Sequence, residues 1–406
     1  WSVTGVQTCA LPIYPDTQAS QFIVERLNFF DMNLPKLRSL FPHTAHTIYL
    51  NHAATSPLST RVTDALHKWM TERQETRIDN YVPFMDTILD VRRQLAGMLS
   101  APLEAVDVCP NVSTALNWVA QGIVWKPGDR IALPACEFPA NVWPFLHLRE
   151  RGVEIDFIPH TDGVFTLQDV EAALTPRTRL LSVSWVQFLS GFRAPLAEIG
   201  KRTRERGVWF LVDAIQGFGA LDFGDVEAQG VDFAAGSAHK WIMADQGIGW
   251  CYMSHRLMEA LHPPMAGWLS GVVDWDNFFD YRFNWHTDLT RYRLGTMNNA
   301  GIATMKAALS VYLECGRQWC NQHVLNNAAY LAMHLEKIGL QRYGSPDPAH
   351  ASGIVTFRHP DPEIVYEQLQ KKHIEISVRN RLLRFAPTYY NTLEELDHTI
   401  DVIKNL

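Results

Sequence analysis

The sequence lacks several features that would each point to a particular class of protein. No apolar run approaches the ~20 residues that a membrane-spanning helix needs, and the longest apolar runs have the length of strands. We therefore expect a soluble protein with no membrane partner. Basic residues do not dominate either, because 36 Lys and Arg stand against 43 Asp and Glu, a net charge of −7. Nucleic acid is not an expected partner, since binding to its phosphates needs a basic face.

Cysteine is also scarce, with six in 406 residues and no CxxC pair. These cysteines are too sparse for a disulfide scaffold, which favours a reducing, cytoplasmic location. Cys315 and Cys320 have no second pair nearby, so we expect no zinc or other metal site. The chain begins at Trp1 rather than Met, and we interpret residues 1–13 as a non-native segment derived from a sequencing adapter.

Hydrophobic residues make up 47% of the chain and charged residues 19%, a balance typical of globular proteins with a real core. Short apolar runs alternate with amphipathic stretches, which predicts a mainly parallel α/β sheet flanked by helices. The runs that we expect to form strands are Ile131–Ala135, Leu180–Val186, Val208–Val212 and Ile248–Met253. The amphipathic stretches that we expect to form helices include Leu167–Leu174 and Leu196–Arg206.

The pattern changes after about Ala300. We expect long helices over Ile302–Leu313 and Asn321–Ile338, strands near 354–357 and 382–386, and a helix over Glu394–Lys404. This pattern predicts a smaller C-terminal α+β domain. The expected divisions are an N-terminal segment 14–50 that packs with the small domain, a large cofactor-binding domain 51–300 and the small domain 301–406.

Three features could carry chemistry. Asp213 ends an apolar strand, at the sheet edge where open α/β proteins bind ligands, although an N-cap or a strand-end salt bridge explains it equally well. Lys240 lies between His239 and Trp241, where desolvation would lower the pKa of its amine, and the alternative is a lysine that reaches solvent from a loop edge. Ser113 begins a helix-like stretch that could hold an anion, the alternative being a plain N-cap.

Taken together, these features suggest pyridoxal phosphate. That cofactor needs a lysine for its aldehyde, a carboxylate for its pyridinium nitrogen and an anion site for its phosphate. At Val212–Gln216, Ser237–Lys240 and Gln246–Gly249 the sequence closely resembles the class V aminotransferase family of fold-type I pyridoxal-phosphate enzymes, which includes cysteine desulfurases and isopenicillin-N-epimerase-like proteins. Tyr49–Thr55 also resembles the opening strand and turn of that family, beside the substrate site.

The resemblance implies a role for each matching residue. Lys240 would be the catalytic Schiff-base residue, Asp213 the partner of the pyridine nitrogen, and Arg384 the substrate-carboxylate residue. Phe138 would stack on the cofactor ring. The remaining cofactor-binding residues would be Gln216 near the phenolic oxygen, and Val112, Ser113, Ser237, His239 and Thr296 at the phosphate, with Thr296 reaching it from a neighbouring subunit. A homodimer with its sites at the interface is therefore expected.

Three departures from the family pattern bear on the reaction. Phe138 occupies a position where desulfurases have a histidine, so it can stack but cannot transfer a proton. Phe188 replaces a frequent Asn beside the phenolic oxygen, which leaves Gln187 as a candidate substitute. No cysteine follows Cys320, so the C-terminal region lacks the desulfurase nucleophile.

The resemblance therefore implies an enzyme that acts on a small amino acid through an external aldimine and a Cα carbanion. An aminotransferase or an epimerase is the first expectation, and a β-lyase, either C–S or kynureninase-like, is the alternative. A non-catalytic scaffold that has retained the fold is the alternative from another class, against which the presence of Lys240, Asp213 and Arg384 argues.

Overall fold

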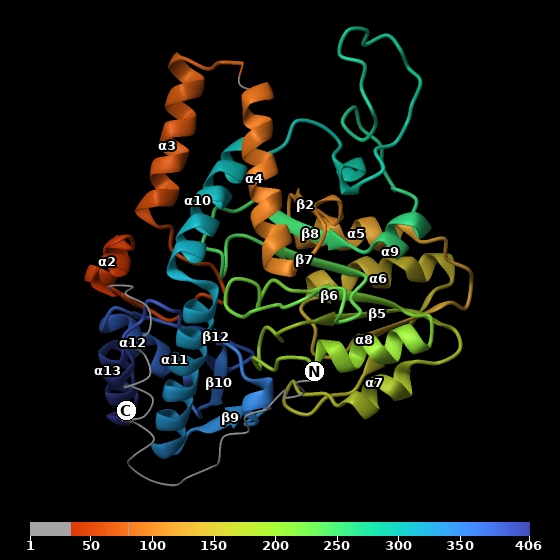
Figure 1. The fold of residues 1–406 in the computed structure, drawn as a ribbon. Coiled ribbons are helices and arrows are strands. Elements are labelled where there is room, and N and C mark those ends of the chain that lie inside the picture. The colour runs from red at the N-terminus through yellow and green to blue at the C-terminus, as the bar shows by residue number, and fades with distance from the viewer. Residues whose placement is uncertain (1–33, 80) are drawn as a thin grey trace, which may run out of the picture.

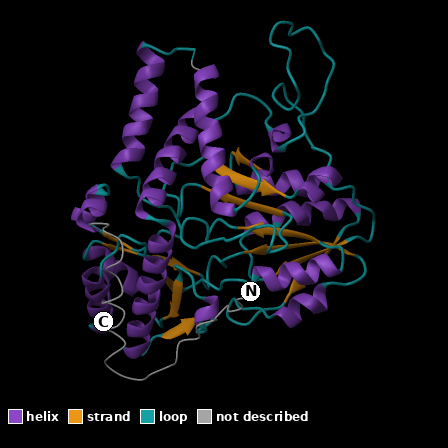
Figure 2. Cartoon of the chain, in the orientation of Figure 1, coloured by secondary structure: helices purple, strands orange, loops and turns teal. Residues whose placement is uncertain are grey.

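The computed structural model describes residues 34–79 and 81–406, and a seven-stranded sheet runs through its larger part (Figures 1 and 2). In spatial order the strands are β2 (Val106–Cys109), β8 (Gly249–Met253), β7 (Phe233–Ser237), β6 (Trp209–Asp213), β5 (Thr178–Ser184), β3 (Arg130–Pro134) and β4 (Glu154–Ile158). Neighbours pair in parallel except around β8, which is antiparallel to both β2 and β7. The predicted α/β fold with a mainly parallel sheet is confirmed.

The reversed strand β8 follows from a short connection. A parallel return needs a crossover of a dozen or more residues, which is usually a helix. Residues 238–248, which join β7 to β8, contain no helix. The chain therefore turns back beside β7, and residue 240 lies in this turn at the carboxyl end of β7.

Helices cover both faces of the sheet (Figure 1). Along β6 the side chains of Phe210 and Val212 join one hydrophobic core and Leu211 joins the other, as the period of two in a strand requires. The first core includes residues of α7 (Leu167–Ala173) and α8 (Leu196–Glu205). The second includes residues of α5 (Val112–Gly122), α6 (Trp143–Leu146) and α9 (His255–Ala260). Both faces are thus buried, which is why these strands are apolar along their whole length.

Three long helices extend beyond one end of the sheet (Figure 1). They are α3 (Thr60–Glu75), α4 (Tyr81–Leu99) and α10 (Asn299–Cys315), and α10 packs against the other two. Gly316, with φ +90°, then separates α10 from α11 (Arg317–Lys337). The two helices expected after residue 300 are therefore present.

The C-terminal region has its own antiparallel sheet and its own core. The sheet has the order β12 (Ser377–Arg379), β13 (Leu382–Phe385), β10 (Val355–Arg358) and β9 (Gln341–Tyr343). Residues of α11, α12 (Pro362–Lys371) and α13 (Leu393–Lys404) pack with it in a third hydrophobic cluster. The strands and the helix expected here are present, while the domain boundary at residue 300 stays a prediction.

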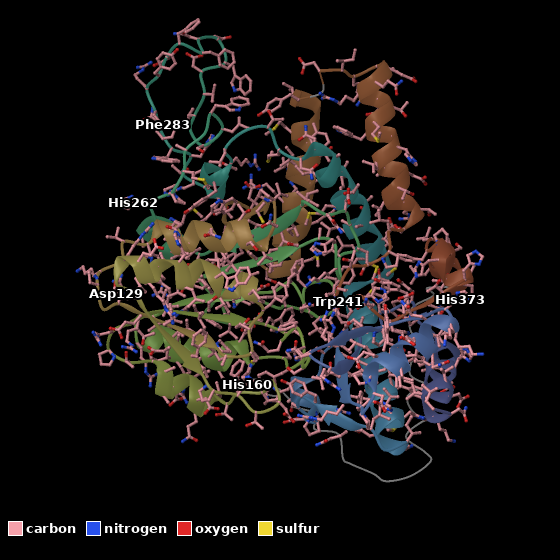
Figure 3. The ribbon with its side chains drawn as sticks, turned by 180° about the vertical axis from the view of Figure 1, so that it is seen from behind. Asp129, His160, Trp241, His262, Phe283 and His373 are labelled. Atoms are coloured by element: carbon pink, nitrogen blue, oxygen red, sulfur yellow. The ribbon has the colours of Figure 1, made fainter. Side chains whose placement is uncertain are left out.

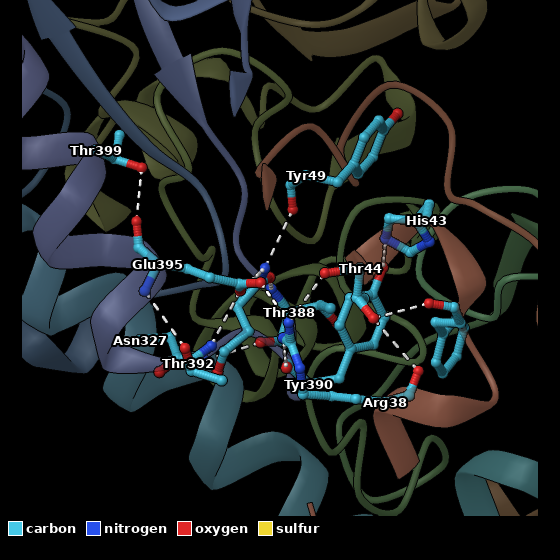
Figure 4. A network of polar contacts seen from close by, with 12 residues as sticks. Arg38, His43, Thr44, Tyr49, Asn327, Thr388, Tyr390, Thr392, Glu395 and Thr399 are labelled. Carbon is cyan, nitrogen blue, oxygen red and sulfur yellow. Dashed lines mark hydrogen bonds and ion pairs between the residues drawn. The ribbon is translucent and has the colours of Figure 1, made fainter. Parts of the chain in front are cut away.

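The first described residues lie against this C-terminal region (Figure 4). Strand β1 (Ile48–Tyr49) pairs in parallel with β11 (Ile374–Glu375). In α2 (Leu34–Ser39), the Arg38 guanidinium donates to Tyr390 O at 2.8 Å and forms an ion pair with Glu395 at 2.6 Å. The segment predicted as non-native, 1–13, and residues 14–33 lie outside the described residues. No helix among the described residues is long and apolar enough to cross a membrane.

Candidate active site

Lys240 lies in the turn after β7, and two features of the sequence place it there. A Cβ atom on Gly236 would lie 2.5 Å from Nε1 of Trp250, so this strand position needs glycine. Trp241 is buried, and its Nε1 donates to Gln216 Oε1 at 3.1 Å, which joins the turns after β6 and β7. Burial lowers the pKa of Lys240 to about 8, with Arg384 acting in the same direction and Asp213 opposing it. This pKa suits a lysine whose neutral amine has to attack a carbonyl.

Asp213 is 2% exposed at the carboxyl end of β6, and the Ile215 amide donates to its Oδ1 at 3.0 Å. Burial raises the pKa of Asp213 to about 7, with Glu137 adding to the effect and the Ile215 amide and Lys240 opposing it. Its Oδ2 has no hydrogen-bond partner within residues 34–79 and 81–406, and the carboxylate forms no ion pair there. Among the described residues, Asp213 therefore does not form the strand-end salt bridge that the sequence left open as an alternative.

Phe138 and its neighbours line the space beside Lys240. The Nζ atom of Lys240 lies 5.9 Å from the centroid of the Phe138 ring, which in turn meets the Phe188 ring edge-on at 5.3 Å. Glu137 points into the protein, where it accepts hydrogen bonds from the Ser184 amide at 2.7 Å, from the Ser184 hydroxyl and from Gln187 Nε2 at 2.7 Å. Burial raises the pKa of Glu137.

The start of α5 meets the end of β7. The Val112 amide donates to the Ser237 hydroxyl at 3.2 Å, so two predicted phosphate residues are in contact. The N-cap of α5 is Asn111, whose Oδ1 accepts from the Thr114 amide at 2.9 Å. The exposed Ser113 is therefore not the capping residue. His239 is half-buried, and burial lowers its pKa.

Arg384 is a buried cation without a carboxylate partner. It is 3% exposed, its Nε donates to Ser377 Oγ at 3.1 Å, and its Nη1 donates to Phe188 O at 2.7 Å. No ion pair involves this guanidinium in the described part of the chain, and burial lowers its pKa to about 10. Arg384 is close enough to Lys240 to lower the pKa of that amine. A buried guanidinium with three of its five N–H groups unused is an incomplete anion site.

The two other predicted residues differ in their surroundings. Gln216 is buried, and besides accepting from Trp241 it donates from Nε2 to Ala53 O at 2.9 Å. Thr296 is exposed, and it lines a separate cleft of about 210 Å³ together with Thr114 and Arg293. Within this chain no contact joins Thr296 to Lys240 or Asp213 among the described residues.

Sequence reasoning missed the roles of two buried polar residues near these groups, Glu137 and His52, and it named Gln187 only as a substitute for the Asn beside the phenolic oxygen. Glu137 and Gln187 are hydrogen-bonded to each other, and Glu137 directly follows the turn after β3, so its place after an apolar strand was a usable signal. His52 is fully buried, with Nδ1 2.9 Å from Ala386 O and Nε2 2.6 Å from the Tyr390 hydroxyl. Burial lowers the pKa of His52 to about 3. No local pattern around His52 indicates that a C-terminal tyrosine would cover it.

Asp213, Ser237 and Lys240 thus lie together at the carboxyl ends of β6 and β7, and the comparisons with known proteins identify the family of the chain. Residues 48–381 match the family described as aminotransferase class-V. The chain belongs to this family. A probable cysteine desulfurase of Methanothermobacter thermautotrophicus is 28% identical over 391 residues, covering 90% of this chain and 96% of that protein. Isopenicillin N epimerase of Amycolatopsis lactamdurans is 27% identical over 337 residues, covering 78% and 84%.

Solved structures show the same fold. A cysteine desulfurase from Thermococcus onnurineus has a TM-score of 0.82 at 23% identity, covering 91% of this chain and 97% of that one. The cystine C–S lyase C-DES, in complex with its product cysteine persulfide, has a TM-score of 0.83 at 23% identity, covering 90% and 99%. The predicted family and the predicted fold-type I architecture are thus confirmed.

Proposed function

We propose that the protein is a pyridoxal-phosphate-dependent enzyme that acts on a small amino acid. The observation that carries the proposal is the geometry of Arg384, which is buried without a carboxylate among the described residues and donates to the carbonyl of Phe188, whose ring contacts Phe138 beside Lys240. A guanidinium binds a carboxylate in a bidentate manner, so an α-carboxylate held there would bring the substrate amine toward Lys240. Family membership and the fold confirm the prediction of pyridoxal phosphate as the cofactor.

The residues present fit this cofactor. Lys240 would hold its aldehyde, and Asp213 Oδ2, which has no partner among the described residues, would face its ring nitrogen. Val112, Ser113, Ser237 and His239 would hold its phosphate, with Phe138 and Gln216 beside its ring. When bound, pyridoxal phosphate supplies an electron sink for the bond that breaks at Cα.

Four residues of the chain have distinct roles in the proposed reaction. Arg384 binds and orients the α-carboxylate. Lys240, with a pKa of about 8, is suited to take the Cα proton and return it. Asp213 keeps a proton at the ring nitrogen. Phe138 has no group that can move a proton, so the proton transfers fall to Lys240.

We favour transamination or epimerisation as the reaction, and β-elimination is the second candidate. The second candidate rests on the relatives named cysteine desulfurase. A persulfide route needs a reactive thiolate. Among the described cysteines only Cys136 is not buried, and burial raises its pKa to about 12. That thiol is a poor nucleophile, which disfavours a route through one of the described cysteines.

The proposal includes a homodimer in which Thr296 of each subunit reaches the phosphate of the other. It is supported by the exposure of Thr296 and by the absence of a contact to Lys240 within the described part of one chain. Sedimentation of a fully active monomer would refute this arrangement. We also propose a cytoplasmic location, which the low cysteine content of the sequence favours.

Two measurements test the function. The purified protein should show a visible absorbance band that Lys240→Ala removes, whereas a colourless protein that binds no added pyridoxal phosphate would be a scaffold. An amino-acid panel with product identification then separates the reactions. An oxo acid indicates transamination, the opposite enantiomer indicates epimerisation, and release of the β-substituent indicates a lyase.

A further inference from the structure

A second cleft opens at the same edge of the sheet as Lys240 and Asp213. Its volume is about 220 Å³. Its walls come from the carboxyl ends of β3, β4 and β5, from β9 and from the turn between β12 and β13. The lining residues are Ala135, Cys136, Glu137, His160, Gly163, Gln187, Phe188, Leu189, Ser190, Tyr343 and Asn380.

The cleft has an open mouth and a buried polar floor. Ala135, His160 and Asn380 are exposed at its mouth, and Figure 3 shows His160 where the sheet domain meets the C-terminal domain. Glu137 and Gln187 are buried at its floor, Gln187 being only 1% exposed. A ligand that enters this cleft therefore passes from solvent to buried hydrogen-bonding groups.

One atom of the floor lacks a partner. Gln187 Nε2 donates to Glu137 Oε1, but Gln187 Oε1 is buried without any hydrogen bond among the described residues. A buried carbonyl oxygen without a donor costs about 1–3 kcal/mol, and because the residue that carries this oxygen lines the cleft, a ligand or water there could supply the missing donor. The free atom is an acceptor, and it calls for a hydrogen-bond donor.

The loop that carries Gln187 is fixed to the C-terminal sheet. The Arg384 guanidinium donates to Phe188 O at 2.7 Å, and the Thr356 hydroxyl donates to Leu189 O at 2.5 Å. Gln187 is thus held in place next to the residue that would bind the substrate carboxylate. Such preorganisation is what a binding group needs in order to discriminate between ligands.

The cleft adjoins the candidate active site through Phe188. This residue lines the cleft, its carbonyl holds Arg384, and its ring contacts Phe138 beside Lys240. If the substrate carboxylate binds Arg384 and the Cα lies at Lys240, the substrate side chain still needs a binding site. The cleft lies on the other side of Phe188 and offers space for it.

The lining also limits the charge of that side chain. Glu137 is the one acidic group among the lining residues, and no Lys or Arg lines this cleft in the described structure. A carboxylate side chain would find no Lys or Arg there, whereas an amide, hydroxyl or ammonium group could donate to Gln187 and Glu137.

We infer that this cleft binds the side chain of the amino-acid substrate, and that Gln187 Oε1 selects a side chain ending in a neutral or cationic hydrogen-bond donor. The inference rests on the proposed function, because it takes the carboxylate position from Arg384. It defines the substrate class as amino acids with amide, hydroxyl or amine side chains, as opposed to apolar or acidic ones.

Binding of substrate analogues to the cofactor-loaded protein tests the proposed side-chain selectivity without turnover. The probes are the α-methyl analogues of glutamine, methionine and alanine, which have no Cα–H to lose, and calorimetry gives their Kd values. Glutamine and methionine side chains have similar lengths, and only the first ends in a strong donor. We expect the wild type to bind the glutamine analogue about 10- to 100-fold more tightly than the methionine analogue.

Two variants separate the donor effect from the shape of the cleft. Gln187→Met should remove the preference for glutamine and leave the alanine analogue unaffected. Ala135→Met narrows the mouth, and should weaken both long analogues relative to alanine. Ala228→Met is the matched control, because Ala228 is exposed in the connection before β7, at the opposite edge of the sheet.

The possible results each decide the inference. It is overturned if the wild type prefers methionine, if Gln187→Met weakens all three analogues equally, or if Ala135→Met behaves like Ala228→Met. If Gln187→Met does not fold, the wild-type preference and Ala135→Met decide. Failure of the proposed function has a different signature, in which the wild type shows no absorbance band and binds none of the analogues.

Discussion

The Nζ atom of Lys240 lies 5.9 Å from the centroid of the Phe138 ring, a distance at which an aromatic face attracts an ammonium group. This attraction favours the charged form of the lysine, yet burial lowers the pKa of Lys240 to about 8. With this pKa, about a tenth of the amine is neutral at pH 7 and about half at pH 8. That property can be measured in the protein without its cofactor.

The first prediction concerns the pH dependence of cofactor loading. Only the neutral amine of Lys240 attacks an aldehyde, so the rate at which the cofactor-free protein takes up pyridoxal phosphate should rise through a midpoint near pH 8. Asp213→Asn removes a charge that raises this pKa and should move the midpoint down. Arg384→Met removes a charge that lowers it and should move the midpoint up. A midpoint near 10.5 in the wild type would show that Lys240 is solvated.

The second prediction concerns Asp213→Asn once the cofactor is loaded. An amide cannot keep the ring nitrogen protonated as a carboxylate does, so turnover should fall about 100-fold or more while the absorbance band persists. Asp222→Asn is a suitable control, because Asp222 is an exposed residue whose ion pair joins Arg317. Equal turnover in the wild type and Asp213→Asn would remove the electronic role assigned to Asp213.

Four strands of the large sheet, β3, β5, β6 and β8, were predictable because their signals are local, whereas β2, β4 and β7 were not predicted. Asp213 ends an apolar strand, which is visible as a run of buried residue types, whereas Lys240 was selected for its neighbours His239 and Trp241. The reversal of β8 was not predicted, since the pattern of a buried strand is the same in either direction.

The surroundings of Arg384 and Gln187 depend on contacts between distant segments, and for that reason the sequence did not predict them. The side chain of Phe188 predicts a lost hydrogen bond, but the backbone carbonyl of this residue is the acceptor for Arg384, 196 positions away. A backbone acceptor carries no sequence signal. The orphaned oxygen of Gln187 likewise becomes visible only once Glu137 is seen to take its amide nitrogen.

The third prediction concerns stability in acid. The pKa of His52 is lowered by burial from 6.5 to about 3, so the unfolded chain binds the proton more readily between these values. Stability should therefore rise with pH across this window and be lost as the pH falls below 6.5, by about 1.4 kcal/mol per unit for one proton. His52→Gln should reduce this slope by about one proton in denaturant titrations, whereas His46→Gln, at an exposed position, should not.

The fourth prediction separates carboxylate binding from chemistry at Arg384. Because this guanidinium is 3% exposed and has no ion pair in the described structure, its charge lacks a counterion until a substrate arrives. Arg384→Ala should lower kcat/KM for amino acids. The loss of transition-state stabilisation should be about 2–5 kcal/mol, the usual effect of removing one member of a desolvated charge pair. For simple amines, which have no carboxylate, kcat/KM should fall much less.

Two further variants test whether the loss of activity is specific to the guanidinium of Arg384. Arg384→Lys should recover little activity, since an ammonium is a point charge and cannot reproduce the planar fork that bonds Phe188 O and Ser377 Oγ. Arg379→Ala is the matched control, because Arg379 is exposed on the paired strand β12. The absorbance band should remain in all three variants. Equal losses for amino acids and simple amines would make Arg384 a structural residue, and the carboxylate of the substrate would then need another site.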